Sequence, residues 1–250
     1  MTIPLPRMKT AGLVNGTFIK TPSPHVVEIL GLSGLDFAVV DMEHAPFDRL
    51  TLDGMIFASC AVQLPLLVRI PEPTPVAILS TLDMGAAGLL VPHVDTAEQA
   101  KAIYAATRHR NGSRGFSGSP RFASYGTMDM KHSMDAGEHS FLMCQIESVQ
   151  AVENAADIAT VDGVDGLFIG YADLALSMGL ESPQDEQVTR AAQRVIEIGL
   201  AAGKVVGMFV ANTTERDKFA ALGVTCFVIG SDQSLLRNAA KALTVPVAKA

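Results

Sequence analysis

The chain has 250 residues, of which 48% are hydrophobic and 18% are charged, and its formal net charge is −7. A chain of this size and composition builds a large core, which excludes a disordered, coiled-coil or collagen-like protein. The negative charge repels phosphate backbones, and no basic stripe with interleaved aromatic residues is present. Both observations argue against a nucleic-acid partner.

No apolar run reaches the ~18 residues that a membrane-spanning helix needs, so we expect no membrane association. The N-terminal segment MTIPLPRMKT lacks the apolar core of a signal peptide, and we therefore expect a cytoplasmic protein. The cysteines Cys60, Cys144 and Cys226 lie far apart in apolar stretches, without a CxxC spacing. We expect all three to be reduced thiols of the core.

Short apolar segments rich in Val, Ile, Leu and Phe recur along the chain. Near-continuous apolar runs of this length are typical of parallel strands that are buried on both faces. The predicted strands are Leu13–Ile19, Asp36–Asp41, Leu64–Ile70, Gly88–Val94, Phe141–Ile146, Gly166–Gly170, Val205–Val210 and Cys226–Gly230.

Segments with helical spacing lie between these strands. Thr96 and Gln99 have the spacing of a capping box at the start of one helix. Gly85, Gly203 and Gly223 follow predicted helix ends, where a left-handed cap favours glycine. The predicted helices are Pro24–Leu32, Asp48–Cys60, Val76–Met84, Thr96–Arg108, Val149–Ala159, Glu186–Ala202, Thr213–Leu222 and Asp232–Leu243.

This alternation predicts a single (β/α)₈ barrel over residues 1–250, a fold whose usual length is about 250 residues. A doubly wound open sheet is the alternative, although neither GxGxxG nor GxxxxGK[ST] follows the first strand. Residues 110–139 are rich in Gly, Ser and Met and are too long for an ordinary loop. Because they follow the fourth strand, we expect them near the catalytic rim or at a subunit contact.

Catalytic residues of such a barrel come from the carboxyl ends of its strands. Four predicted strand ends carry His44, Arg69, Glu147 and Asp173. Charged groups at the end of an apolar strand are costly to desolvate unless they are paired or bind a metal. Each has another explanation alone: the two acids as parts of helix caps, and Arg69 as a surface partner of Glu72. Their coincidence on one rim predicts an active site.

Glu147 and Asp173 follow consecutive strands, which lie about 4.8 Å apart in a sheet. Two carboxylates so close repel each other unless a proton or a cation lies between them. Oxygen ligands with open positions for water and substrate suit Mg²⁺ or Mn²⁺, and no second His or Cys completes a tetrahedral zinc site. We therefore predict a divalent metal ion (Mg²⁺, Mn²⁺ or Co²⁺) held by these two carboxylates.

Such a site would bind a 2-oxo acid through its carboxylate and keto oxygens. The ion and Arg69 would stabilise the negative charge of an enolate. Histidine titrates near neutrality, so we expect His44 to abstract the C3 proton. The segment Gly170–Asp173 turns from strand into helix, and its backbone N–H groups would hold the substrate carboxylate.

Four motifs resemble the HpcH/HpaI aldolase family of class II pyruvate aldolases, which act on 4-hydroxy-2-oxo acids. They are DMEHAP at 41–46, LLVP at 89–92, QIE at 145–147 and GVDGLFIG at 163–170. The resemblance extends from about residue 10 to residue 240. It implies a lyase that cleaves such an acid reversibly to pyruvate and an aldehyde with the help of a divalent ion.

The resemblance also implies a role for each matching residue. His44 would be the base, Arg69 would stabilise the enolate, and Glu147 and Asp173 would bind the metal. The implied substrate contacts are Arg69, Gln145, Gly170 and the backbone of Ala172 and Asp173.

Asp83 matches a family carboxylate that raises the basicity of the histidine, across a subunit boundary. On spacing alone, Asp83 would be a solvated carboxylate near a helix C-terminus. Asp41 lies nearer to His44 in sequence and could also orient its ring. The resemblance further implies a homo-oligomer, a hexamer made of trimers with the last helix exchanged between neighbours.

The chain departs from the family pattern at Tyr171, where proline is common, and in the segment Phe116–Tyr125. These departures leave the acceptor aldehyde open. Arg121 and Tyr125 either reach an acceptor carboxylate or form a packing or subunit contact. His93 ends the fourth strand, where it lines the site or has a structural role.

Three other interpretations stay open. A class I aldolase would need a lysine in the barrel for a Schiff base, and Lys20 at the end of the first strand is the candidate. An oxaloacetate decarboxylase would use Glu147, Asp173 and Arg69 without needing His44. A barrel kept only for binding would require these rim charges to be incidental.

Overall fold

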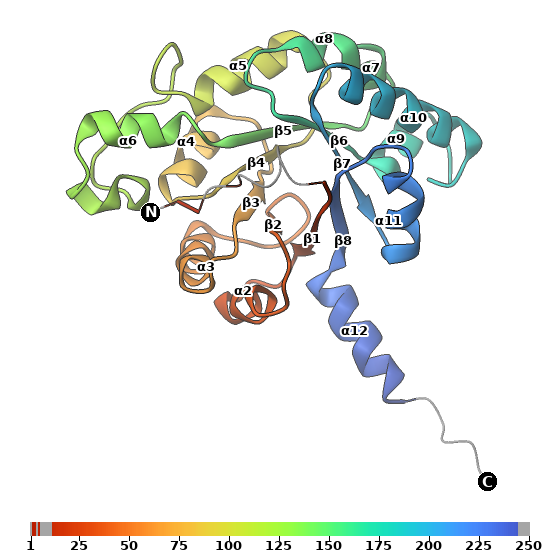
Figure 1. Cartoon of the computed structure of the whole chain (residues 1–250), viewed down its shortest axis with the longest axis horizontal. Helices are drawn as coiled ribbons and strands as arrows, with labels where there is room; N and C mark the ends of the chain where they lie inside the picture. The colour runs from red at the N-terminus through yellow and green to blue at the C-terminus, as the bar shows by residue number, and fades with distance from the viewer. Residues whose placement is uncertain (1, 4, 6–11, 245–250) are drawn as a thin grey trace.

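The computed structural model describes residues 2–3, 5 and 12–244. Eight parallel strands close into a barrel in chain order, and the last strand pairs with the first (Figure 1). The predicted fold class is confirmed, and each predicted strand is present with ends shifted by a few residues at most. The strands are β1 (Val14–Ile19), β2 (Ala38–Asp41), β3 (Leu66–Arg69), β4 (Gly88–Val91), β5 (Phe141–Ile146), β6 (Gly166–Ile169), β7 (Val205–Val210) and β8 (Cys226–Ser231).

The helices surround this barrel. The capping box of Thr96 and Gln99 is present, and Gly85, Gly203 and Gly223 have the positive φ angles of 99°, 67° and 95° that glycine tolerates. The helices are α2 (Pro24–Gly31), α3 (Arg49–Val62), α4 (Pro75–Asp83), α5 (Ala97–Thr107), α6 (Met130–Gly137), α7 (Val149–Glu153), α8 (Ala155–Thr160), α9 (Tyr171–Ser177), α10 (Glu186–Ala201), α11 (Thr213–Ala220), α12 (Asp232–Ala242) and the 3₁₀ helix η1 (Arg121–Gly126).

Two parts of the helical layer differ from the prediction. The helix expected at Val149–Ala159 is divided into α7 and α8 at Asn154, whose side-chain amide donates to the carbonyl of Asp95 at 2.8 Å. The segment 110–139 is not a plain loop, because it contains η1 and α6.

The segment 110–139 lies at the end of the barrel where the strands begin. It lines a cavity of about 370 Å³ together with Ala86, Ala87 and Ser140, which directly precede β4 and β5. Arg121 also donates to the carbonyl of Met84 at 2.7 Å. The prediction that placed this segment near the catalytic rim is therefore wrong, because the segment follows α5, which leads back from the end of β4. A role in a subunit contact stays a prediction.

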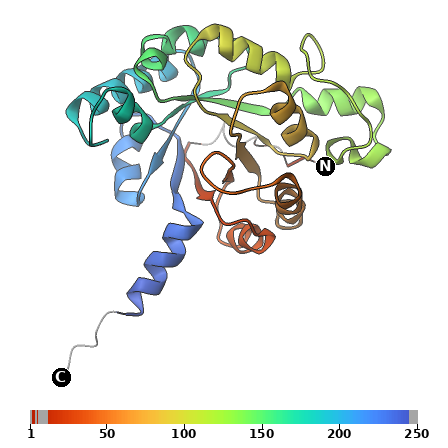
Figure 2. The same ribbon diagram turned by 180° about the vertical axis from the view of Figure 1, so that it is seen from behind.

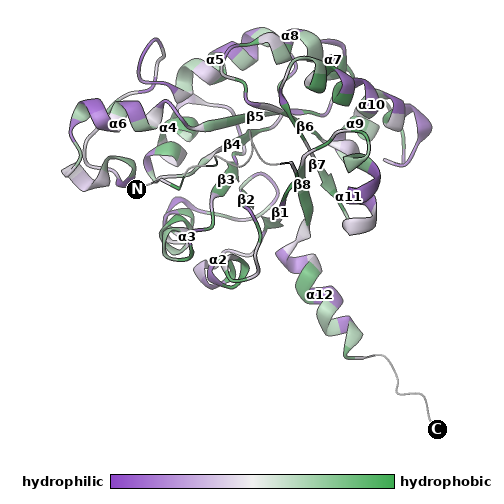
Figure 3. Cartoon of the chain, in the orientation of Figure 1, coloured by the Kyte–Doolittle hydropathy of each residue, from purple (hydrophilic) through white to green (hydrophobic). Residues whose placement is uncertain are grey.

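Apolar side chains form two layers, one inside the barrel and one between the barrel and its helices (Figure 3). Along β7, Val206 and Met208 face the helices, whereas Val205 faces the interior, as the alternation of a strand requires. The barrel is thus a packed core and no pore. The interior layer comprises Val14, Phe18, Phe37, Val39, Leu67, Leu90, Phe141, Met143, Phe168, Val205, Cys226 and Val228.

The three cysteines are free, and Cys144 and Cys226 are buried as predicted. Cys60 is only partly buried on α3, so it is not the core thiol that the sequence predicted. None of the helices in the described part of the chain has the length and hydropathy to cross a membrane.

The last helix, α12, projects away from the barrel, as both views show (Figures 1 and 2). Its first residue is anchored, because the carboxylate of Asp232 accepts from the backbone N–H groups of Lys20 at 2.8 Å and Thr21 at 3.0 Å. Farther along, Leu236 is 73% exposed. The helix therefore presents an apolar side chain to solvent in the isolated chain.

Gly88 tests the close approach of β4 and β5. A Cβ atom at Gly88 would lie 2.2 Å from the backbone oxygen of Phe141, and this backbone cannot yield without disturbing the ladder. We expect Gly88→Ala to lower the free energy of unfolding by roughly 3 kcal/mol, measured by urea denaturation. In α3, Gly54→Ala meets only Pro24 Cγ at 3.5 Å and should stabilise the chain by about 0.5–1 kcal/mol. Equal effects of the two substitutions would contradict this account.

Candidate active site

A network of opposite charges joins the ends of β1, β2 and β3. Asp41 and Arg69 are register partners, and Arg69 donates from Nε to Asp41 Oδ1 at 2.9 Å and from Nη2 to Oδ2 at 2.7 Å. Lys20 Nζ lies 3.0 Å from the same Oδ2. Burial by itself raises the pKa of Asp41, but Arg69 and Lys20 outweigh burial and lower this pKa to about 2. Asp41 is therefore a fully ionised anchor for Arg69.

The residues after Asp41 carry the network toward the barrel mouth. Glu43 Oε2 lies 3.2 Å from Arg69 Nη1, so acidic side chains contact all three nitrogens of the guanidinium. The backbone N–H of His44 donates to Asp41 Oδ1 at 3.2 Å, and the ring Nε2 lies 3.8 Å from Glu43 Oε2. Asp41 thus supports the backbone of His44, while the His44 side chain is 53% exposed at the mouth.

Glu147, directly after β5, is a buried carboxylate with both oxygens engaged. Its Oε1 accepts from the backbone N–H of His93 at 2.7 Å, and its Oε2 accepts from the amide of Gln145. Burial raises the pKa of Glu147, and the nearby charge of Asp173 raises it further, against the hydrogen bonds from His93 and Gln145. A Cβ atom at Gly170 would lie 2.8 Å from Glu147 Cβ, so glycine is required there.

Asp173 lies in the first turn of α9, which begins directly after Gly170. The first backbone bond of this helix runs from Leu174 N to Gly170 O at 3.0 Å. The N–H groups of Tyr171, Ala172 and Asp173 therefore lack partners within the helix and are available as donors. The Tyr171 ring packs 5.8 Å from that of Phe219, and burial raises the pKa of the Tyr171 hydroxyl to about 12.

The donor chemistry at Glu147 and Asp173 fits a hard divalent cation. Arg69 and Lys20 compensate Asp41 and Glu43, whereas no lysine or arginine of the described ranges forms an ion pair with Glu147 or Asp173. Within those ranges the buried Gln145 Oε1 lacks a hydrogen-bond partner.

Only two protein ligands are available for such an ion. No group of three or more His, Cys, Asp or Glu side chains suited to a metal occurs among residues 2–3, 5 and 12–244. Two carboxylate ligands leave positions for water and substrate, as Mg²⁺ and Mn²⁺ prefer.

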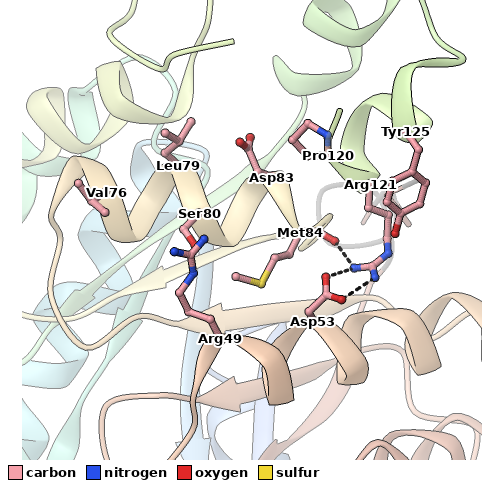
Figure 4. A pocket seen from close by; sticks show the side chains of 10 residues that line it. All are labelled: Arg49, Asp53, Val76, Leu79, Ser80, Asp83, Met84, Pro120, Arg121 and Tyr125. Carbon is pink, nitrogen blue, oxygen red and sulfur yellow. Dashed lines mark hydrogen bonds and ion pairs between the residues drawn. The ribbon is translucent and has the colours of Figure 1, made fainter. Parts of the chain in front are cut away.

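Asp83 is separated from this rim, because it ends α4 near the start of β4 (Figure 4). Its Oδ1 lies 2.8 Å from Nη2 of the buried Arg114. It lines a cavity of about 430 Å³ in which none of the rim residues takes part. Arg121 and Tyr125 line the same cavity, and Arg121 pairs with Asp53 at 2.7 Å. Neither reaches the rim of its own chain.

The structure adds two residues to the predicted set. Glu43 lies between Arg69 and His93, and each ring nitrogen of His93 lies within 3.2 Å of a carboxylate oxygen. Glu43 belongs to the DMEHAP motif at the end of β2, and this position was its available signal. His93 follows β4, where a site role and a structural role were both open.

Comparison with known proteins agrees with this geometry. A 5-keto-4-deoxy-D-glucarate aldolase from Klebsiella pneumoniae is 35% identical over 230 residues, which cover 91% of this chain and 90% of the relative. A hydroxypyruvate/pyruvate aldolase from Delftia acidovorans is 35% identical over 237 residues, 94% of this chain and 88% of the relative. The crystal structure of an HpcH/HpaI aldolase/citrate lyase family protein from Burkholderia cenocepacia is 31% identical with a TM-score of 0.90, and the match covers 96% of each chain.

The family described as HpcH/HpaI aldolase/citrate lyase matches residues 15–239. This match spans the strands from β1 to β8 and every residue of the rim network. The sequence resemblance is thereby confirmed. The chain belongs to the HpcH/HpaI aldolase/citrate lyase family and is a carbon–carbon lyase.

Proposed function

We propose that the protein catalyses the reversible, metal-dependent aldol cleavage of a 4-hydroxy-2-oxo acid to pyruvate and an aldehyde. The observation that carries this proposal is the buried Glu147 beside Asp173, on the same rim as the anchored Arg69 and the exposed His44. The two relatives above are named as aldolases for 5-keto-4-deoxy-D-glucarate and for hydroxypyruvate or pyruvate, which supports this substrate class.

Glu147 and Asp173 would hold the divalent ion. When bound, this ion would polarise the keto group of the substrate and help to stabilise enolate charge. The free N–H groups of Ala172 and Asp173 would bind the substrate carboxylate, because the start of a helix favours anions. Gln145 and Gly170 border this position, since both lie against Glu147.

Arg69 and His44 would move the charge and the proton. Arg69 would donate to the oxygen that becomes negative, and its contacts with Asp41 and Glu43 hold the guanidinium in place before substrate arrives. In the synthetic direction His44 would remove a proton from C3 of pyruvate, and C3 would then attack the aldehyde carbon. In the cleavage direction the same ring would take the proton of the C4 hydroxyl as the C3–C4 bond breaks.

We propose that Asp83 acts on His44 only from another copy of the chain. Asp83 lies at the barrel end opposite the rim, so it is remote from its own His44. This role requires a homo-oligomer, and the family resemblance implies a hexamer made of two trimers. Light scattering of the purified protein measures this mass directly.

A substrate screen tests the proposal. We expect 4-hydroxy-2-oxo acids with different tails to release pyruvate, activity to vanish after chelation, and Mg²⁺, Mn²⁺ or Co²⁺ to restore it. Pyruvate release that survives complete chelation would overturn metal dependence. Borohydride inactivation in the presence of pyruvate would instead indicate imine chemistry at Lys20.

Oxaloacetate decarboxylation is the second candidate, because Arg69 is anchored independently of the exposed His44. That reaction passes through the same pyruvate enolate and needs no base at C3. We expect His44→Ala to lower retro-aldol cleavage by about 100-fold or more and to retain most oxaloacetate decarboxylation. Coupled assays of pyruvate formation from both substrates measure the two rates. Equal loss of both activities would contradict this division of roles.

A further inference from the structure

His93 contacts two carboxylates of the rim and has an unusual backbone. Its φ is 56°, in the left-handed region that residues other than glycine seldom occupy. Its backbone N–H donates to Glu147 Oε1 at 2.7 Å, and its ring Nδ1 lies 3.2 Å from the same oxygen. The ring Nε2 lies 3.1 Å from Glu43 Oε1. One residue thus makes three polar contacts with the two acids.

The left-handed conformation has a cost that the contacts of His93 offset. A left-handed backbone costs a residue with a Cβ atom roughly 1–2 kcal/mol, and such residues persist where their surroundings hold them. His93 comes directly after Pro92, beyond the end of β4, and its side chain is 63% exposed. Core packing therefore does not explain the strain, whereas the contacts with Glu147 and Glu43 do.

We propose that His93 is a positioning residue that fixes the carboxylate of Glu147 for metal binding, an inference that rests on the proposed function. Glu147 Oε1 is held by the N–H and the ring of His93, and Oε2 is held by Gln145. A carboxylate fixed in this way loses little conformational freedom when a cation binds. Partners of this outer-shell kind typically contribute 10–100-fold to metal affinity.

His93 also connects the two halves of the site. Glu43 contacts His93 through Oε1 and Arg69 through Oε2, and Arg69 is anchored on Asp41. A continuous polar chain therefore runs from the end of β2 to Glu147 beyond β5. His93 is the link in this chain between the arginine side and the metal side.

Mn²⁺ binding without substrate tests the proposal. His93→Gly removes the ring but keeps the backbone N–H and tolerates a positive φ, so the chain should fold. We expect this variant to bind Mn²⁺ about tenfold more weakly or worse, measured by calorimetry or by the electron spin resonance of free Mn²⁺. Gln63→Gly is the matched control, because Gln63 is also left-handed (φ 54°) but caps α3. We expect the control to bind Mn²⁺ like the wild type.

A second variant separates the ring from the backbone. His93→Asn also tolerates the left-handed conformation, and its short amide can serve one carboxylate but cannot bridge both, so its Mn²⁺ affinity should fall between those of wild type and His93→Gly. Thermal unfolding of each variant without metal should stay close to that of wild type.

The outcomes of this experiment separate the two proposals. Unchanged Mn²⁺ affinity in folded His93→Gly, or an equal loss in Gln63→Gly, overturns the role of His93 alone. A wild-type protein that does not bind Mn²⁺ overturns the proposed metal site and the role of His93 with it.

Discussion

Glu147→Gln is expected to abolish detectable Mn²⁺ binding and to lower retro-aldol cleavage by roughly 1000-fold, or about 4 kcal/mol of transition-state stabilisation. Glutamine keeps the size of the side chain but removes the charge of one of the two carboxylates assigned to the ion. Mn²⁺ titration and the rate of pyruvate release measure the two effects.

The same substitution should leave the metal-free fold at least as stable as the wild type. Burial and the charge of Asp173 both raise the pKa of Glu147, so the ionised carboxylate is costly in the folded chain. Thermal unfolding without metal checks this expectation. Glu153→Gln, at an exposed position of α7, is the matched control and should change neither binding nor rate. A Glu147→Gln enzyme with near wild-type turnover would remove the basis of the metal site.

Asp41→Asn is expected to have the largest effect on stability, a loss of about 3–5 kcal/mol in the free energy of unfolding. Asp41 is fully buried and compensates both Arg69 and Lys20, so a neutral side chain leaves these two cations without their shared partner. Retro-aldol activity should fall as well, because Arg69 loses its two-point anchor. Urea denaturation and steady-state kinetics at neutral pH measure the two losses.

The pH dependence of stability gives an independent check of Asp41. Its folded pKa of about 2 lies below the ordinary value of 3.8, so its stabilisation is complete above about pH 4. As pH falls from about 4 to about 2, roughly 2 kcal/mol of this stabilisation is lost. Asp41→Asn should lack this part of the acid sensitivity, whereas Asp48→Asn, at the exposed cap of α3, should retain it. An unaltered acid profile in Asp41→Asn would assign the sensitivity to other groups.

The barrel could be predicted because each strand, buried on both faces, is nearly continuous in apolar residues. The segment 110–139 gave no such pattern. Its helix α6 has the sequence MKHSMDAG, and the main contacts of the segment, such as Arg121 with Asp53, join residues far apart in the chain. Its place at the start of the strands follows from the direction of α5, which the sequence pattern alone left unused.

The rim was predicted from the rule that strand ends carry the chemistry, which led to Arg69, Glu147 and Asp173. The links between them depend on side-chain direction and on strand register, such as Asp41 beside Arg69. The bridge made by His93 depends on a left-handed backbone, which nothing in the local sequence requires. The remoteness of Asp83 from its own rim likewise follows from three-dimensional placement.

The filled interior of the barrel determines how small molecules reach and leave the rim. Phe18 lies beneath Arg69, with its ring centroid 4.7 Å from the guanidinium carbon, and tops a column of packed side chains that includes Phe37 and Phe141. This column closes the passage through the centre of the sheet. Entry and exit therefore share one doorway, and a product seated against the aromatic floor departs only after the one above it.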